Sequence, residues 1–343
     1  MIAIWDVGFA FWNRESKQRY LSFVVCAILV LFCSAVEAQQ SKKVPLIGFL
    51  NASSPSSVAP RLEAFRHGLR ELGYAETQNI IVEYRHAEGK QERLKELAEE
   101  LVRLNVDVIV AGGTASTRAA RDATRIIPIV MTNVSDPVVL GFAGSLSRPL
   151  GNITGLSTLA PELSGKRLEL LKEIKPRMSR VALLGDVVNP GNAQAVREIQ
   201  LVAEAAGVKL QHYLDIRDAR DIEPAILAAT KGQAEIVLAL TSAVLFTQRK
   251  RLTELAVKNR LPIMYGQPEY VEDGGLISYG TNISDLYRRA AFFVGKILKG
   301  TRPADLPLEQ PIRFELVINL RTAKQLGLSI PPNVLAKADR VIQ

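Results

Sequence analysis

Two successive series of short apolar runs, each run followed by an amphipathic segment, constrain this chain more than any other feature of its sequence. The short apolar runs are rich in Val, Ile and Leu, as is typical of buried strands. The longer segments place apolar residues three or four positions apart, as in a helix with one buried face. Strands separated by helices run parallel, with right-handed crossovers. The pattern therefore predicts an α/β protein built on doubly wound parallel sheets.

The expected elements can be placed by this periodicity. In the first series we expect strands at residues 44–50, 80–84, 106–111 and 127–131, and helices at 61–72, 91–104 and 114–124. In the second series we expect strands at residues 180–184, 208–213, 236–240 and 262–265, and helices at 192–206, 221–231 and 246–259.

Landmarks recur in the same order in both series. Gly73 and Gly207 each end the first helix, and an apolar-Pro-Ile triplet opens the fourth strand at residues 127–129 and again at 261–263. We therefore predict two similar Rossmann-like lobes. The first would comprise residues 44–153 with a returning helix at 280–300, and the second residues 157–275 with a C-terminal segment at 305–343. Glycines at 151–155 and 274–275 are candidate hinges.

Residues 1–38 have the features of an export signal. Arg14, Lys17 and Arg19 precede an uncharged run at 20–33, and Ala38 ends a small-residue cleavage site, so that Gln39 would be the first mature residue. The run is shorter than the about 20 apolar residues that a membrane-spanning helix needs. An uncleaved anchor stays open as an alternative. The sequence predicts a periplasmic protein.

Both cysteines, Cys26 and Cys33, lie in the segment expected to be removed. The mature protein would have no disulfide and no cysteine metal site. The net charge is +8, but Lys and Arg are scattered among Glu and Asp along the expected helices. This mixture indicates a solvated surface and not a nucleic-acid-binding patch.

In an open parallel sheet, ligands bind beyond the carboxyl ends of the strands. Two such edges facing each other would make a cleft, and the loops after the strands are its candidate walls. The candidate ligand-binding residues in these loops are Ser53, Ser54, Gly113, Thr114, Ala115, Ser116, Asn133, Ser135, Asp136, Asn189, Asn192, Thr241, Ser242, Tyr265 and Glu269.

Three of these features have two interpretations each. Residues 112–116 would place free N–H groups at a helix N-terminus, which suits a carboxylate or phosphate, or Thr114 is an ordinary N-cap. Asp136 could pair with an amino group, or simply begin a turn with Pro137. Tyr265 could stack on a flat ligand, or cover the end of the sheet.

Catalytic motifs are absent from the sequence. It has no Walker motif, no Gly-x-Gly-x-x-Gly, no Gly-x-Ser-x-Gly and no His-Glu-x-x-His. The three histidines, His67, His86 and His212, have no metal-like spacing. We therefore expect no catalytic residue, no metal and no cofactor.

Several longer motifs resemble the periplasmic ABC-type substrate-binding proteins that include tryptophan- and tyrosine-binding components. They are KVPLIGFL at 43–50, FRHGLRELGY at 65–74, DPVVLG at 136–141, SLSRPLGNITG at 145–155, NRLP at 259–262, GGLISYG at 274–280, FELVINL at 314–320 and AKQLGLSIP at 323–331. The resemblance implies a type I periplasmic-binding fold with three crossings between the lobes. It also implies amino-acid-like ligands held between the loops named above.

The expected function is therefore an extracytoplasmic solute-binding component of an ABC importer. It would be a monomer that captures an amino-acid-like solute, with an aromatic one as an option, and serves a permease with a separate ATPase. A ligand-sensing module that feeds an extracytoplasmic sensor kinase is the alternative. A periplasmic enzyme that uses Asp136 and Glu269 as an acid–base pair is a third hypothesis.

Overall fold

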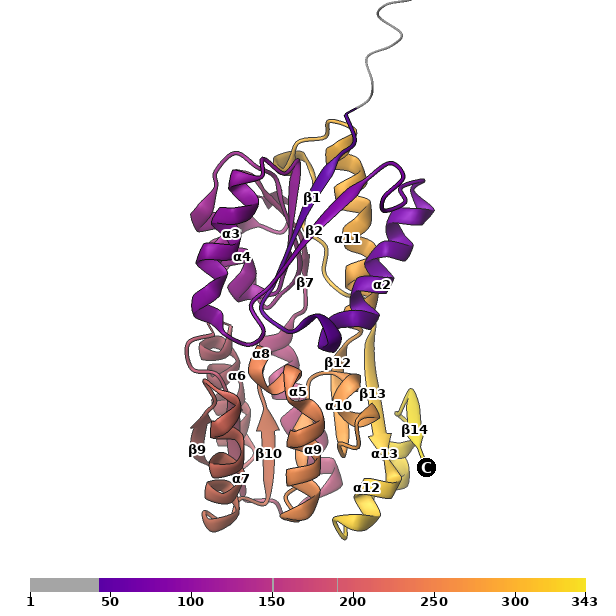
Figure 1. The fold of residues 1–343 in the computed structure, drawn as a ribbon. Helices are drawn as coiled ribbons and strands as arrows, with labels where there is room; N and C mark the ends of the chain where they lie inside the picture. Colours follow the sequence, from indigo (N-terminus) through magenta and orange to yellow (C-terminus); the bar gives the residue numbers. More distant parts are fainter. Residues whose placement is uncertain (1–42, 150, 190) are drawn as a thin grey trace, which may run out of the picture. The chain divides into compact units, whose positions relative to one another are not determined.

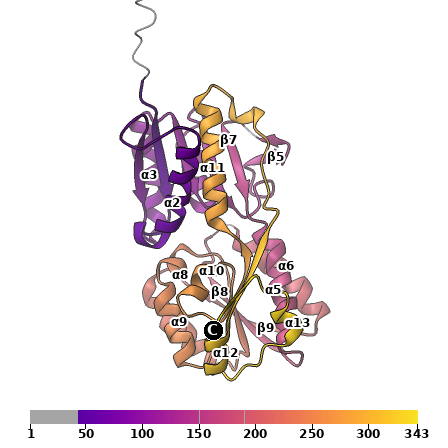
Figure 2. The same cartoon turned by 90° about the vertical axis from the view of Figure 1, so that its right-hand side faces the viewer.

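The computed structural model describes residues 43–149, 151–189 and 191–343, so the expected export signal lies outside the described residues. Residues 45–343 form one compact unit that contains two α/β lobes (Figures 1 and 2). The predicted fold class is confirmed, and every strand and helix expected from the periodicity is present with shifted ends.

The first lobe is built on a parallel sheet of strand order β2-β1-β3-β4-β7. Its strands are β1 (Leu46–Asn51), β2 (Ile81–His86), β3 (Val108–Gly112), β4 (Ile129–Val134) and β7 (Ile153–Ser157). Its helices are α2 (Pro55–Glu71), the short η1 (Gln91–Arg93), α3 (Leu94–Arg103) and α4 (Thr114–Ala123), and β5 (Ala143–Ser145) pairs with β6 (Arg148–Pro149) in a small hairpin.

Helices cover both faces of this first sheet. The face with Ile47, Phe49 and Val110 packs against α2 and against α11 (Ile283–Leu298), which comes from far along the chain (Figure 1). The other face packs against α3 and α4 through a second apolar cluster. Burial on both faces explains why these strands are apolar throughout and do not alternate.

The second lobe is built on a sheet of strand order β14-β13-β12-β11-β10-β8-β9, in which β13 runs antiparallel to β12 and the other pairs are parallel. Its strands are β8 (Arg180–Gly185), β9 (Lys209–Asp215), β10 (Ile236–Ala239), β11 (Ile263–Tyr265), β12 (Ile277–Thr281), β13 (Phe314–Asn319) and β14 (Arg340–Ile342). Its helices are α5 (Ala160–Ile174), α6 (Asn192–Ala205), η2 (Ala219–Asp221), α7 (Ile222–Lys231), α8 (Ala243–Thr247), α9 (Arg249–Lys258), α10 (Pro268–Glu272), α12 (Leu320–Gln325) and α13 (Pro332–Leu335).

The chain crosses between the lobes at three places within the described residues. It passes from β7 to α5 at Thr158 and Leu159, and from β12 to α11 at Asn282. After η3 (Pro303–Asp305), residues 306–309 still pair with β7 before the chain enters β13. The candidate hinge glycines therefore do not lie at these crossings. Gly151 precedes β7, which completes the first sheet, and Gly274–Gly275 lies in a turn of the second lobe.

The repeated landmarks have the same geometry in both lobes. Gly73 and Gly207 both adopt a positive φ, of 83° and 63°, directly after the first helix of each series. At both positions the next residue donates its backbone N–H back into the last helical turn, Tyr74 to Leu69 and Val208 to Ala203. This helix ending needs a left-handed residue, for which glycine has no steric penalty.

A candidate ligand site between the two lobes

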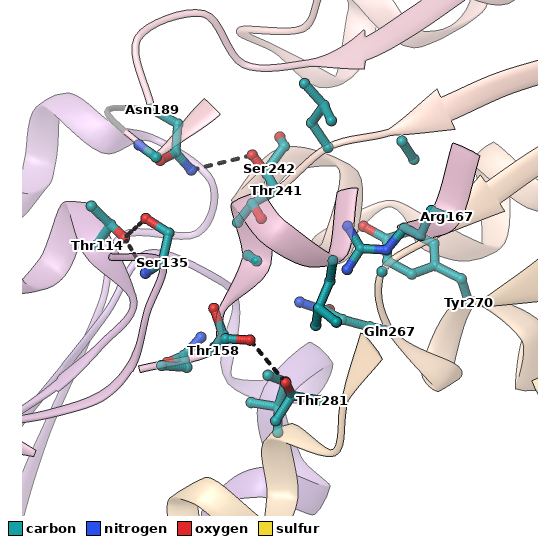
Figure 3. A pocket seen from close by; sticks show the side chains of 18 residues that line it. Thr114, Ser135, Thr158, Arg167, Asn189, Thr241, Ser242, Gln267, Tyr270 and Thr281 are labelled. Atoms are coloured by element: carbon teal, nitrogen blue, oxygen red, sulfur yellow. Dashed lines mark hydrogen bonds between the residues drawn. The ribbon is translucent and has the colours of Figure 1, made fainter. Parts of the chain in front are cut away.

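A cavity lies where the carboxyl ends of the strands of the two lobes face each other (Figure 3). It holds about 700 Å³ of empty space, part of it open to solvent. Its first-lobe and hinge lining is Thr114, Asn133, Ser135, Thr158, Thr281 and Ile283, and its second-lobe lining is Ala160, Leu163, Arg167, Asn189, Gly191, Ala239, Leu240, Thr241, Ser242, Gly266, Gln267 and Tyr270.

A second cavity adjoins the first and shares much of its wall. It shares Thr114, Asn133, Asn189, Thr241, Ser242 and Gln267 with the first. It adds Asn51, Ala52, Ser53, Arg61, Gln91, Gly112, Gly113, Ala115, Ala243, Phe246 and Tyr287. The two cavities therefore form one cleft between the lobes.

The first-lobe wall is the start of α4. Gly113 has a φ of 93° and is the N-cap, so Thr114 is the first residue of the helix and not its cap. The Thr114 hydroxyl accepts the backbone N–H of Ser135 at 3.3 Å and lies 3.3 Å from the Ser135 hydroxyl (Figure 3). The ends of β3 and β4 are thereby held together at the cleft.

The second-lobe wall is held by asparagines. Asn189 donates from Nδ2 to the carbonyl of Thr241 at 3.2 Å. Asn192, which is buried, donates from Nδ2 to the carbonyls of Asp186 and Thr241, both at 2.8 Å. The Ser242 hydroxyl caps α8 by accepting the N–H of Leu245 at 3.2 Å. These bonds fix the loops after β8 and β10 against each other.

Arg167, on α5, is the cationic side chain of the first cavity. The residue is 6% exposed, and its guanidinium points into the cavity (Figure 3). Its Nε donates to the carbonyl of Tyr279 at 2.6 Å and its Nη1 to the hydroxyl of Ser164 at 3.2 Å. Within the described residues, Nη2 has no hydrogen bond and no carboxylate forms an ion pair with the guanidinium. Burial lowers the pKa of Arg167 to about 10.

Two glycines make room for this guanidinium. A Cβ at Gly266 would lie 3.0 Å from Nη2 of Arg167. A Cβ at Gly280 would lie 2.1 Å from the carbonyl oxygen of Gly266 and 3.3 Å from the same Nη2. Side chains at these two positions would displace Arg167, so the glycines position it.

Arg61, on α2 of the first lobe, reaches across to the second lobe. Its Nε and Nη2 donate to Oε1 of Glu269 at 2.9 and 2.7 Å, and Nη2 also donates to Oε1 of Gln267 at 2.9 Å. Its guanidinium carbon lies 3.9 Å from the centroid of the Phe246 ring. Burial raises the pKa of the Glu269 carboxyl, but Arg61 outweighs this and the pKa is lowered. Glu269 is therefore ionised and neutralises Arg61.

The structure brings many of the predicted site residues together. Those that line the cleft are Ser53, Gly113, Thr114, Ala115, Asn133, Ser135, Asn189, Thr241 and Ser242. Those that do not line it are Ser54, Ser116, Asp136, Asn192, Tyr265 and Glu269.

The residues outside the lining have partners or burial of their own. Tyr265 is 1% exposed and stacks on Tyr270, with ring centroids 4.6 Å apart. Asp136 accepts the N–H groups of the next turn and, from the other lobe, Nε2 of Gln194 at 3.0 Å. Ser54 precedes α2 and bonds Ser57, and Ser116 is fully buried.

Several residues of the lining were not among those predicted from the sequence. They include Asn51, Arg61, Thr158, Arg167, Phe246, Gln267, Tyr270, Thr281 and Tyr287. Some lie on helices, where the sequence gives no sign of which face meets the cleft. Gln267 lies between Tyr265 and Glu269, which were both predicted, and it follows β11 as the strand-end argument requires.

Metal-binding clusters and membrane-spanning helices are both absent from the described residues. No group of His, Cys, Asp and Glu there could hold a metal ion. None of the helices in that part of the chain has the length and apolar character needed to cross a bilayer.

The fold and the cleft define a class, the two-lobed binding proteins of type I periplasmic-binding architecture, to which solved structural neighbours also belong. The family model described as ABC transporter substrate binding protein matches residues 43–342. The chain therefore belongs to the ABC transporter substrate-binding proteins. Proteins of this family bind solutes outside the cytoplasm and are not enzymes, so the chain is a binding protein.

Individual relatives agree with this assignment. A tyrosine-binding protein of Clostridioides difficile (strain R20291) is 26% identical over 290 residues, which cover 84% of this chain and 82% of the relative. An ABC domain from Streptococcus pneumonia, solved in complex with L-Trp, is 26% identical with a TM-score of 0.80, over 87% of this chain and 99% of that one. A conserved domain protein from Vibrio cholerae is 28% identical with a TM-score of 0.82, over 87% of this chain and 100% of that one.

Proposed function

We propose that this protein is the solute-binding component of an ABC importer and captures an amino-acid-like solute with an aromatic side chain. The solute would lie in the cleft between the lobes, with its carboxylate on Arg167. The names of the tyrosine-binding relative and of the L-Trp complex support this ligand class. A permease with a separate ATPase would be the partner, and a monomer suffices because the lining comes from one chain.

Arg167 carries the proposal. A buried guanidinium with an unbonded Nη2 is stabilised by an anion in the cavity, and a carboxylate matches its geometry. Leu163, Leu240, Ile283 and the ring of Tyr270 supply apolar surface in the same cavity. A flat side chain bound there would remove apolar area from water on both sides.

Export to the periplasm is part of the proposal. Residues 1–38, with cleavage after Ala38, support it by their charge and apolar pattern. Mass spectrometry of the protein purified from the periplasm would test it, with Gln39 as the expected first residue. Recovery of the uncleaved chain in the membrane fraction would indicate the anchor instead.

The ligand class can be tested by titration of the mature chain. Trp5 and Trp12 are the two tryptophans and lie in the expected signal, so the fluorescence of bound L-Trp would have no protein tryptophan background. We expect calorimetry to detect the binding of aromatic amino-acid-like ligands. We expect Arg167→Met to lower their affinity about tenfold or more. Arg177→Met, which removes an exposed charge just beyond α5, should bind as the native chain does. Equal binding by both variants would refute the role of Arg167.

A further inference from the structure

The charged side chains that line the two cavities are both arginines, Arg61 and Arg167. Arg167 has no carboxylate partner within the described residues, and Arg61 is neutralised by Glu269. None of the described residues that line the two cavities is Asp or Glu. An amino acid brings an ammonium as well as a carboxylate, and a desolvated ammonium is costly unless a carboxylate or several acceptors meet it.

Three side-chain amides of the lining, those of Gln267, Asn189 and Asn133, each have a hydrogen bond on the oxygen. Oε1 of Gln267 accepts from Arg61 at 2.9 Å, and Oδ1 of Asn189 accepts the backbone N–H of Gly191 at 3.1 Å. Oδ1 of Asn133 accepts the hydroxyl of Thr132 at 2.5 Å. Guanidinium and backbone N–H groups only donate, so the orientations of Gln267 and Asn189 are fixed.

The cleft therefore offers Nε2 of Gln267 and Nη2 of Arg167 as hydrogen-bond donors. A carboxylate with a neighbouring hydroxyl or keto oxygen can accept from these groups. An ammonium cannot, since it has donors only, and Arg167 repels it. The remaining partners for an ammonium are hydroxyl groups and backbone carbonyl oxygens, which carry no charge.

We propose that the site selects a deaminated acid, an aromatic 2-hydroxy or 2-oxo carboxylate, over the corresponding amino acid. This inference rests on the proposed function, because it assigns a substrate class to the same cleft. The 2-substituent determines the specificity: as an oxygen it can accept hydrogen bonds from these donors, and as an ammonium it meets no carboxylate in the described lining.

The test compares matched ligands on the mature chain by calorimetry at pH 7. The probes are L-tryptophan with indole-3-lactate and indole-3-pyruvate, and L-tyrosine with 3-(4-hydroxyphenyl)lactate and 3-(4-hydroxyphenyl)pyruvate. We expect the hydroxy or oxo acid to bind at least about tenfold more tightly than its amino acid.

Gln267→Glu gives a sharper second measurement. It keeps an oxygen for Arg61 but turns the atom that faces the cleft from a donor into a charged acceptor. We expect the preference to shift toward the amino acid by about tenfold or more. Gln325→Glu adds the same charge on exposed α12, outside the lining, and should leave the preference unchanged.

The outcomes are distinct. Tighter binding of the amino acids by the native chain, or an unchanged preference in a folded Gln267→Glu variant, would overturn this inference and leave the proposed function standing. Binding of none of the six probes would overturn both.

Discussion

Replacing Gly280 by alanine should disturb both the stability of the second lobe and the affinity for a carboxylate. The added Cβ would lie 2.1 Å from the carbonyl oxygen of Gly266, so β11 and β12 must separate locally by about 1 Å. Overpacking of this kind costs about 1–3 kcal/mol. For a chain of this size each kcal/mol lowers Tm by about 2–4 °C, so we expect a decrease of about 2–12 °C.

The same change moves the guanidinium of Arg167, because its Nη2 lies 3.3 Å from the new Cβ and 3.0 Å from the Cβ position of Gly266. A hydrogen bond to a charged group contributes about 1.5–3 kcal/mol, so losing one weakens binding roughly 10- to 100-fold. Calorimetry at 25 °C with the tightest of the matched probes measures this, and circular dichroism confirms that the variant is folded.

Gly165→Ala is the matched control, on the helix that carries Arg167. Its Cβ would lie 3.0 Å from a methyl group of Val202 and 3.9 Å from the carbonyl oxygen of Glu198, and alanine is favoured over glycine inside a helix by about 1 kcal/mol. We expect unchanged affinity and a stability within about 1 kcal/mol of native. If Gly280→Ala bound the probe as tightly as this control, Gly280 and Gly266 would not position Arg167.

Three further predictions concern closure, acid stability and the cleft wall. Gly191→Val should weaken ligand binding about tenfold or more with little change in Tm, because its Cβ would lie 2.4 Å from the Ser135 hydroxyl of the other lobe; an unchanged dissociation constant would contradict this. Burial raises the pKa of Glu235, but hydrogen bonds led by Lys175 outweigh it and lower the pKa to about 2. Its contribution is therefore full above pH 4.5 and is lost as the pH falls through about 2; Glu235→Gln should cost roughly 2 kcal/mol at pH 7 and well under about 1 kcal/mol at pH 2, read from urea unfolding at both values. Asn192→Leu should cost about 2–4 kcal/mol by removing two buried hydrogen bonds, and urea unfolding within 1 kcal/mol of native would refute that.

The fold could be predicted because strands that are buried on both faces of a parallel sheet consist of continuous apolar runs, which can be recognised in the sequence. The ends of the elements were less accurate. The first helix begins at Pro55, not at residue 61, and Pro60 lies within it. The helix expected at 246–259 is divided at Gln248 into α8 and α9.

The candidate site could be predicted only where it follows strands. Asn133 and Ser135 come directly at the end of β4, and the geometry of parallel sheets places such residues at the cleft. Arg167 gave no such signal. Its neighbour Lys166 is exposed while Arg167 is buried, and that difference arises from Gly266 and Gly280, which tertiary packing brings to it from about 100 residues away.

The packing of α11 onto the first lobe has a consequence for synthesis. The apolar face of the first sheet, shared by α2 and α11, lacks half of its cover until residues 283–298 have been made. Because residues 158–282, which form most of the second lobe, are translated in between, at about 5–20 residues per second, that face stays half covered for roughly 6–25 s. A nascent chain that ends after β7 should therefore expose apolar surface and attract chaperones, whereas the second lobe needs no part of the first to complete its sheet.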